Sequence, residues 1–455
     1  MATMPVMINR AAPTTILVKW PTRERPALFR RQFNAWRQRQ SGRHQVHYLI
    51  TLDSDDPTMT DQLAQFTACP NIHAVVGPPS GKIGACNRDM EIIGRLWPGM
   101  KPDIVMLTSD DMTPIAQHWD QQIARDMNVH FPLYDGALHY HDGYLGGDTL
   151  ITLSIMGWNL YRRFGYFYHP SYKSLRCDNE FTAVVRVLGK YRYSPQTLFR
   201  HDHIGRQSDS LHRKNESFFQ ADGAMYNARK TRGFDLSPPL LSILIPMLRQ
   251  RTDSFNILAG ELHHQIWALG QRHWDVELHA IRDRGEQTVV AKCNELLAMA
   301  RGKFVVFIDD DDMVAPSYVQ DILDAIGRNP DADCIGLAGT MSIDGQPHAE
   351  FDHSLQYTRN TKVDNVYLQP SNHLSPILRE IALQVKFPAW NCHEDAAYSR
   401  GVAKLLRCEE SIRDSNGQRK RLYHYQFRND GTATHNAHSR YKVLHGSLSS
   451  PANNL

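Results

Sequence analysis

The sequence predicts an α/β protein made of two similar halves, and three observations support this prediction. Short apolar strands alternate with stretches of helical periodicity, a pattern typical of largely parallel sheets. The same order of strand, asparagine-bearing helix start, strand and acidic turn occurs twice, about 200 residues apart. In both halves the aspartates of the acidic turn come within two residues of the end of this second strand. Because open α/β sheets bind ligands at the carboxyl ends of their strands, the aspartates are the first candidate site.

The clearest stretch is FVVFIDDDDMVAP at residues 304–316. Residues 304–308 are apolar and β-branched or aromatic, as in a buried strand, and four aspartates follow at once. Pro316 then opens a segment with one apolar helical face. Since four adjacent carboxylates repel one another, we expect a positive group among them. The plain alternative is a solvated acidic turn, against which the buried strand argues.

The composition is that of an ordinary globular protein, without the long apolar runs that cross membranes. The N-terminus lacks the pattern of a secretory signal. Seven cysteines without a CxxC pair predict a reduced, cytoplasmic chain rather than a disulfide framework or a zinc site. The net charge of +3 permits an anionic partner without requiring one.

Taken in order, the first half predicts strands at 15–18, 46–52, 72–76 and 103–108, with helices at 28–39 and from 82. The second half predicts strands at 241–245, 276–281 and 304–308, with a helix from 291. The Gly- and Pro-rich stretch 233–239 is the expected seam. We therefore expect domains at 1–236 and 237–440, followed by a polar tail at 441–455.

The halves align through short strings of matching residues. Cys86-Asn87 matches Cys293-Asn294, and Asp110-Asp111-Met112 matches Asp311-Asp312-Met313. This order indicates duplication of a whole domain, because solenoid repeats are far shorter.

Clustered aspartates without cysteine suit hard cations such as Mg²⁺ or Mn²⁺. Magnesium is often held by one or two carboxylates together with substrate phosphates, so we expect a phosphate-bearing ligand. Neither GxxxxGK[ST] nor GxGxxG occurs, which excludes the usual P-loop and dinucleotide-binding motifs.

The second half resembles family 2 glycosyltransferases of the GT-A fold over roughly residues 239–435. The resemblance rests on a strand, a helix that begins Ala-Lys-x-Asn, a strand that ends in D-x-D-D, a later acidic motif at 393–395, and an aromatic segment at 422–425. It implies two GT-A-like domains, each a mostly parallel nucleotide-binding sheet flanked by helices. The first half resembles the same family more distantly.

The resemblance also implies roles for particular residues. Asp309, Asp310 and Asp311 would bind the nucleotide sugar, and Asp311 or Asp312 the metal. Asp395, with Glu394 second, would be the base that deprotonates the acceptor. A single base without an enzyme nucleophile implies inversion at the anomeric carbon. The alternative for Glu394 and Asp395 is a helix N-terminus that carries favourable acids.

In the first half Thr108 stands where the first aspartate is expected, which puts ribose contact in doubt. The candidates that remain there are Asp110 for nucleotide and metal, and Asp111 for metal. Residues 177–180, Cys-Asp-Asn-Glu, fall where the second half has Cys-His-Glu-Asp at 392–395, which matches Glu180 with Asp395. Asp178 or Glu180 would be the base. Histidines after the acidic motif are further candidate metal ligands, although packing explains them equally well. They are His201 and His203 in the first half, and His424 and His435 in the second.

Four residues near the helix starts complete the candidate set for the nucleotide sugar. Lys82 and Lys292 are candidates for the diphosphate, and a solvated lysine is an equal alternative. Asn87 and Asn294 are the matched asparagines of the two halves.

The expected function is a metal-dependent, inverting glycosyltransferase, bifunctional if both halves are active, with a nucleotide-sugar donor. A surface or lipid-linked glycan is the expected acceptor, and hydroxymethylated bases in duplex DNA are an alternative. A first half that only binds acceptor is another alternative. A metal-dependent nuclease or nucleic-acid-binding protein is the remaining one, for which a stronger Lys/Arg footprint would be expected.

Overall fold

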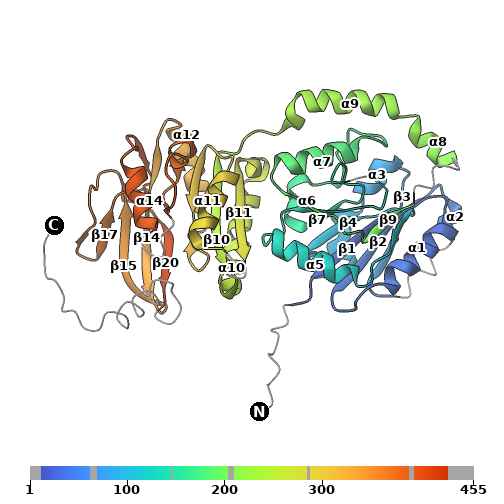
Figure 1. Ribbon diagram of the computed structural model, residues 1–455, viewed down its shortest axis with the longest axis horizontal. Helices are drawn as coiled ribbons and strands as arrows, with labels where there is room; N and C mark the ends of the chain where they lie inside the picture. Colours follow the sequence, from blue (N-terminus) through green and yellow to red (C-terminus); the bar gives the residue numbers. More distant parts are fainter. Residues whose placement is uncertain are drawn as a thin grey trace, which may run out of the picture. The chain divides into compact units, whose positions relative to one another are not determined.

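The computed structural model describes residues 12–61, 69–144, 147–202, 210–283, 287–388 and 394–428. The chain divides into two compact units, Met1–Leu236 and Ser237–Leu455, each with its own main sheet. In Figure 1 the first unit is coloured from blue to green and the second from yellow to red. No helix in the described ranges has the length and apolar character to cross a membrane.

The first unit is built on a seven-stranded sheet of order β3-β2-β1-β4-β7-β6-β8. Its strands are β1 (Thr15–Pro21), β2 (Gln45–Asp53), β3 (Ile72–Gly77), β4 (Ile104–Leu107), β6 (Ala137–Tyr140), β7 (Ile155–Gly157) and β8 (Tyr191–Ser194). A separate antiparallel pair joins β5 (Met112–Pro114) to β9 (Phe199–His201). The helices are α1 (Pro26–Gln38), α2 (Pro57–Thr60), α3 (Gly81–Asn87), α4 (Ile93–Leu96), α5 (Trp119–His130), α6 (Trp158–Phe164), α7 (Cys177–Val187), α8 (Ser210–Glu216) and α9 (Phe219–Thr231).

One face of this sheet is covered by α1 and α5. Alternate residues of β1 point to opposite faces, so Ile16, Val18 and Trp20 meet the aromatic side of α1. Phe29, Phe33 and Trp36 follow helical spacing and are buried there. The opposite face carries α3, with Ile83 and Cys86 buried.

The second unit contains the strands β10 (Leu241–Leu248), β11 (Val276–Asp283), β12 (Phe304–Phe307), β13 (Met313–Val314), β14 (Cys334–Ile343), β15 (Gln346–His353), β16 (Thr361–Val363), β17 (Val366–Gln369), β18 (Ile377–Leu378), β19 (Glu409–Ser411) and β20 (Arg421–Phe427). Its helices are α10 (Thr252–Ala268), α11 (Val289–Met299), α12 (Tyr318–Arg328), α13 (Arg379–Ala382) and α14 (Glu394–Ala403). The main sheet follows the order β11-β10-β12-β18-β14-β15-β17-β16. One of its faces packs on α11 and α14 through a core that includes Leu244, Val305, Phe307 and Tyr398.

The α/β class is confirmed, but the sheets are mixed rather than mostly parallel. In the first unit, β3, β2, β1 and β4 are parallel, whereas β7 is antiparallel to both its neighbours. In the second, β11, β10 and β12 are parallel, and β18 runs against its neighbours. Short returning strands such as β18 carry too little periodicity for the sequence to reveal them.

The two sheets share a common strand order. Strands β2-β1-β4-β7-β6-β8 correspond to β11-β10-β12-β18-β14-β19, and the pair β5–β9 corresponds to β13–β20. Backbone bonds fix the register: Thr108 donates its amide to Lys19, as Ile308 does to Leu244. Residues 104–111 therefore align with 304–311, one position away from the alignment that the sequence strings suggested.

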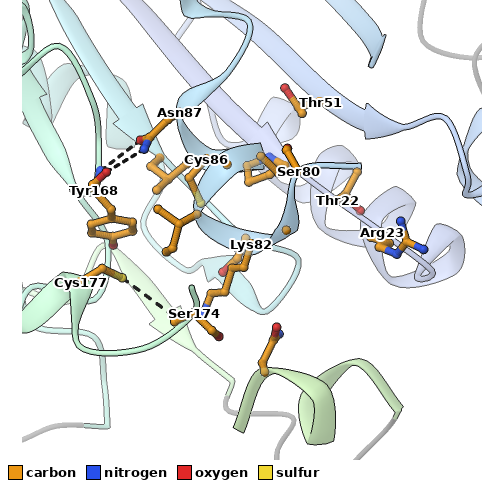
Figure 2. Close-up of a pocket in the computed structure, with 18 of the residues that line it drawn as sticks. Thr22, Arg23, Thr51, Ser80, Lys82, Cys86, Asn87, Tyr168, Ser174 and Cys177 are labelled. Carbon is orange, nitrogen blue, oxygen red and sulfur yellow. Dashed lines mark hydrogen bonds between the residues drawn. The ribbon is translucent and has the colours of Figure 1, made fainter. Parts of the chain in front are cut away.

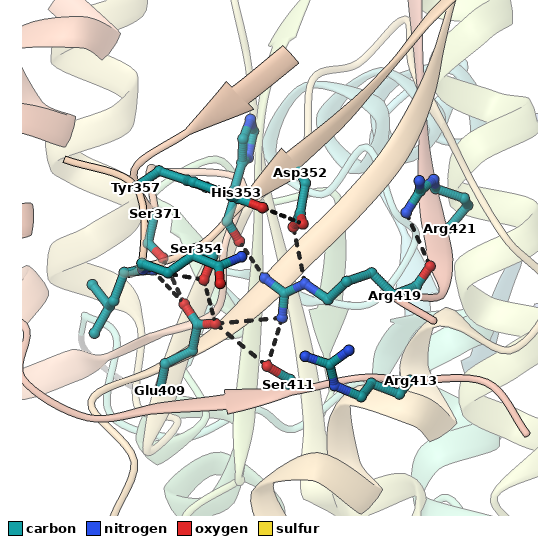
Figure 3. A network of polar contacts seen from close by, with 12 residues as sticks. Asp352, His353, Ser354, Tyr357, Ser371, Glu409, Ser411, Arg413, Arg419 and Arg421 are labelled. Atoms are coloured by element: carbon teal, nitrogen blue, oxygen red, sulfur yellow. Dashed lines mark hydrogen bonds and ion pairs between the residues drawn. The ribbon is translucent and has the colours of Figure 1, made fainter. Parts of the chain in front are cut away.

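A buried polar network fixes β20, the strand that reaches the acidic turn (Figure 3). Arg419, just before it, donates to Asp352 (2.9 Å), Ser411 (2.7 Å) and the carbonyl oxygen of His353 (3.0 Å). Glu409 lies 3.3 Å from the same guanidinium and accepts the amide of Leu355 at 2.7 Å. The network joins β15, β19 and the start of β20.

Candidate active site

The four aspartates after β12 alternate between two environments. Asp310 and Asp312 are each 1% exposed, whereas Asp309 and Asp311 are partly exposed. Asp310 accepts the amide of Leu248 at 2.6 Å and a guanidinium bond from Arg251 at 3.0 Å. These contacts hold the turn against the end of β10.

Asp312 is also engaged within the protein. It accepts a hydrogen bond from the Tyr423 hydroxyl (2.7 Å) and one from the amide of Gln426 (2.7 Å). Burial raises the pKa of Asp310 and of Asp312. The carboxylates of Asp310 and Asp312 are thus engaged within the protein. Asp309 and Asp311 form the partly exposed, outward pair of the turn.

The outward pair lies in a field of negative charge. Burial raises the pKa of Asp309 to about 6; His373 opposes the shift, and Asp395 and Asp311 add to it. Asp311 is paired with Arg251, whose guanidinium nitrogen lies 2.9 Å away. Arg251 is thus a positive group of the kind expected among the aspartates, and it comes from the 3₁₀ turn Arg249–Arg251.

The structure brings Asp395 and the acidic turn together, since Asp395 acts on the pKa of Asp309. The Asp395 carboxylate is exposed at the start of α14. An exposed carboxylate beside the outward pair is available to accept a proton from a substrate hydroxyl. The side chain of Glu394 lies outside the described residues, as do His203 and His435.

Three other candidates of the second unit are occupied within the protein. His424 faces β14, where its ring nitrogens meet the hydroxyls of Thr340 (2.7 Å) and Ser342 (3.2 Å). Lys292 has no exposed surface and donates to the carbonyl oxygen of Met247 at 2.8 Å. Asn294 exchanges two bonds with the backbone of Phe387, both of 3.1 Å.

The first unit contains a cleft of about 890 Å³ at the carboxyl ends of β1 and β4. It is lined by residues from α3, from the turn after β4 and from the segment that leads into α7. Figure 2 shows Lys82 extending across it towards Ser174 and Cys177. The cleft is also lined by the sequence candidates Asn87, Asp110, Asp111, Asp178 and His201.

In the turn after β4, buried and partly exposed residues alternate as they do in the turn after β12. Asp110 is buried and accepts bonds from the Trp20 indole (2.9 Å) and the Thr22 hydroxyl (2.8 Å). Burial raises its pKa to about 7. Asp110 therefore corresponds to Asp310, and its carboxylate is likewise engaged within the protein.

Ser109 and Asp111 are the partly exposed pair of this turn. Asp111 lies 3.3 Å from His201 Nε2 and also accepts a bond from the Ser109 hydroxyl. Although burial acts to raise it, the pKa of Asp111 stays below its ordinary value because of His201 and Ser109. In this register Ser109, rather than Thr108, replaces the first aspartate.

Of the two base candidates in the first unit, only Asp178 faces the cleft. Glu180 is 4% exposed and is held by Arg229 at 2.7 and 2.9 Å and by the Tyr172 hydroxyl at 2.7 Å. Glu180 is therefore a structural group rather than a base. Burial raises the pKa of Asp178, and Lys82 opposes the shift.

Asn87 plays the same structural part as Asn294. It donates to the carbonyl oxygen of Tyr168 at 2.7 Å and accepts the amides of Phe167 (3.0 Å) and Tyr168 (3.2 Å). Asn87 and Asn294 thus hold the loops before α7 and α14, the helices that carry the candidate bases. Both side-chain amides are engaged by the backbone of these loops.

Sequence reasoning missed Arg251, His373 and Tyr425. Tyr425 follows Tyr423 with the period of a strand, and the acidic groups Asp309 and Asp312 act on its pKa, which burial raises. That spacing is the signal that could have placed Tyr425 on the site face and His424 away from it.

Comparison with known proteins adds a family match within the second unit. Residues 268–381 match the family described as Glycosyl transferase family 2. The chain carries a family 2 glycosyltransferase domain. The matched segment contains α11 with Asn294, β12 and the whole acidic turn. No curated protein matches the chain.

Several solved structures show a distant likeness. Staphylococcus aureus TarS 1-349 in complex with UDP-GlcNAc is 14% identical, with a TM-score of 0.30, over 43% of this chain and 60% of that one. The mannosyltransferase PcManGT from Pyrobaculum calidifontis, in complex with GDP-Man and Mn²⁺, is 15% identical, with a TM-score of 0.33, over 43% and 59%. The catalytic domain of Drosophila β1,4-galactosyltransferase 7 is 12% identical, with a TM-score of 0.29. The chain thus spans about 60% of the length of the first two.

Proposed function

We propose that the second unit transfers a sugar from a nucleoside-diphosphate donor to a hydroxyl acceptor. The observation that carries the proposal is the outward pair Asp309 and Asp311 at the end of β12, with Asp395 beside it. The pair lies within the segment that matches the glycosyltransferase family.

The same pair fits a divalent cation, Mn²⁺ or Mg²⁺. Burial raises the pKa of Asp309, and the neighbouring carboxylates of Asp395, Asp311 and Asp310 add to the shift. A divalent cation would relieve that repulsion. Within the described residues no cluster of three or more His, Cys, Asp or Glu could hold a metal alone. Asp309 and Asp311 would therefore hold the cation together with the donor phosphates, where it would neutralise charge on the departing diphosphate.

Asp395 is the proposed general base. It would take the proton of the acceptor hydroxyl while the hydroxyl oxygen bonds to the anomeric carbon. The bond from that carbon to the phosphate oxygen breaks, and the nucleoside diphosphate leaves with the electron pair. A single displacement of this kind inverts the anomeric centre.

The proposed acceptor is a surface or lipid-linked glycan, and the proposed compartment is the cytoplasm. The common strand order of the two sheets supports a GT-A-like fold for the first unit as well. Retention on duplex DNA that weakens steeply with salt would instead favour glycosylation of DNA bases.

The test is turnover of a panel of UDP-, GDP- and dTDP-sugars by the full chain, with Mn²⁺ or with chelator. The variants are Asp311→Asn and Asp395→Asn, with Asp324→Asn on the exposed side of α12 as matched control. We expect metal-dependent turnover of at least one donor. Asp395→Asn should slow transfer about 10²- to 10⁴-fold while donor binding persists. Absence of turnover and binding for every donor would overturn the proposal.

A further inference from the structure

The family match at residues 268–381 lies in the second unit, yet the cleft of the first unit repeats the site geometry of the second. The registers that align Thr108 with Ile308 also align Asp111 with Asp311. The amide of Ile115 donates to Leu198, as that of Ala315 donates to Leu422. In this alignment His201 has the position in β9 that Tyr425 has in β20. It lies on the face of β9 that contacts the turn after β4.

Helices α7 and α14, which carry Asp178 and Asp395, also correspond. Phe181 packs on Tyr168 at a ring distance of 6.3 Å, and Tyr398 packs on Phe387 at 4.0 Å. Tyr168 and Phe387 are the residues fastened by Asn87 and Asn294. Asp178 lies three residues before Phe181, and Asp395 lies three residues before Tyr398. The two aspartates therefore occupy the same position on α7 and α14. The sequence strings had matched Glu180 with Asp395 instead.

We infer that the first unit is a second nucleotide-sugar site, with a donor diphosphate and a divalent cation held by Asp111 and His201, and with Asp178 as base. This inference rests on the function proposed for the second unit. An aspartate and an imidazole are both ligands for Mn²⁺, and the two already lie 3.3 Å apart in the cleft. The structure has the volume for a nucleotide sugar, about 890 Å³.

The reaction at this site balances as in the second unit. Asp178 takes the proton from an acceptor hydroxyl, whose oxygen bonds to the anomeric carbon. The bond to the phosphate oxygen breaks and the nucleoside diphosphate leaves with its electrons. Lys82 extends towards Cys177, the neighbour of Asp178 in the chain (Figure 2). It opposes the rise in the pKa of Asp178 and is placed to balance charge there.

Helix α9 positions the segment that carries Asp178. Its Asp222 accepts the amides of three successive residues, Lys173 (2.9 Å), Ser174 (2.8 Å) and Leu175 (2.7 Å). Its Arg229 holds Glu180 on the buried side of α7. These contacts with α9 therefore hold the loop before Asp178 in place, and Asp178 lines the cleft.

The two sites differ in their outward pair. Ser109 replaces Asp309, so the first site offers one carboxylate fewer, and a histidine replaces Tyr425. His201 faces Asp111 where Arg251 faces Asp311. The two sites therefore need not select the same nucleotide, and two different donors would fit as well as one.

The test counts nucleotide sites by calorimetric titration of the full chain with UDP, GDP and dTDP in the presence of Mn²⁺. We expect two sites per chain, for one nucleotide or for two different ones. Asp111→Asn should weaken one site by at least about tenfold, because removing even a group that only orients a metal ligand costs about 10–100-fold. His201→Gln should act on the same site, and Asp311→Asn on the other. Asp61→Asn, exposed in the first unit, is the matched control.

The outcomes separate the two proposals. One site per chain, lost in Asp311→Asn and unchanged in both Asp111→Asn and His201→Gln, overturns this inference and leaves the proposed function intact. Absence of any site in wild type overturns both. If two sites are found, Asp178→Asn should keep both and lose only the turnover that Asp111→Asn also loses. Turnover unaffected by Asp178→Asn would contradict its assignment as base. Melting curves of each variant check that it folds.

Discussion

Arg251 gives the second unit a permanent positive charge at its acidic turn. Its guanidinium contacts both Asp310 and Asp311, at 3.0 and 2.9 Å, and its side chain is 19% exposed. A hydrogen bond between charged groups of this kind is typically worth about 1.5–3 kcal/mol. A cation bound at Asp311 would compete with Arg251, and a donor diphosphate would offer the guanidinium a new partner.

We predict that Arg251→Met weakens binding of a nucleoside diphosphate in chelator by about tenfold or more, because the guanidinium is lost. The same change should tighten binding of Mn²⁺ alone, since Asp311 loses its competing partner. Calorimetric titration measures both affinities. The control is Arg249→Met, an exposed arginine of the same turn. Equal affinities in the two variants would contradict this role for Arg251.

His353 is a second residue with a measurable consequence. It is 3% exposed, and its Nε2 lies 3.1 Å from Gln369 Oε1 and 3.2 Å from Asn372 Nδ2. Burial lowers the pKa of His353 to about 3. The folded state therefore keeps the ring neutral down to a pH at which the unfolded chain has already taken up the proton.

The predicted result is that the free energy of unfolding of the second unit falls as the pH drops from about 6.5 towards 4. The stabilisation is fully present above the unfolded pKa, near 6.5, and is lost on acidification, at no more than about 1.4 kcal/mol per pH unit. Urea unfolding of wild type and His353→Asn across this range measures the difference. A difference in unfolding free energy that does not change with pH would show that His353 titrates normally.

Strand β20 links the stability of the second unit to its candidate site. Tyr423 on this strand donates to Asp312, and Arg419 anchors the strand from its amino-terminal side. The Arg419 side chain is 9% exposed, and its partners Asp352 and Glu409 are 8% and 11% exposed. Removal of the guanidinium would leave two carboxylates with little solvent and without this cation.

We predict that Arg419→Met lowers the free energy of unfolding of the second unit by about 3–5 kcal/mol, the usual effect of breaking a buried ion pair on one side. Arg413, on the same hairpin and visible in Figure 3, is exposed. Arg413→Met should stay within about 0.5 kcal/mol of wild type. Denaturant unfolding distinguishes the two, and similar losses would mean that the network is not the anchor.

The elements also explain which candidate residues the sequence could place at this turn. Asp309, Asp311 and Asp395 follow from a buried strand and an acidic helix start, which local pattern reveals. Asp310 and Asp312 belong to the same run of letters, and only the turn decides which carboxylates face inward. The matching of short residue strings paired Glu180 with Asp395, whereas the structure aligns Asp178 with Asp395. The loops before α7 and α14 differ in length, and string matching does not account for that difference.

The α/β class and the common order of the two halves could be predicted from the alternation of strands and helices and from the recurrence of the acidic turn. The antiparallel strands β7 and β18 escaped prediction because they are two or three residues long. Arg251 escaped because its role depends on where β10 ends relative to the turn. These features depend on which residues of distant strands lie opposite each other. Local propensity does not determine that register, so the sequence alone could not predict it.

We propose above that Asp309 and Asp311 hold a cation and the donor diphosphate in the second unit. The most direct measurement is anomalous diffraction from crystals of the full chain soaked with Mn²⁺ and a nucleotide sugar identified by the turnover panel. We expect a manganese peak beside Asp311, with the diphosphate bound to it, Asp395 facing the sugar and Asp312 still bonded to Tyr423. A nucleotide bound away from this turn, or a cation held by Asp312 instead, would contradict this proposal.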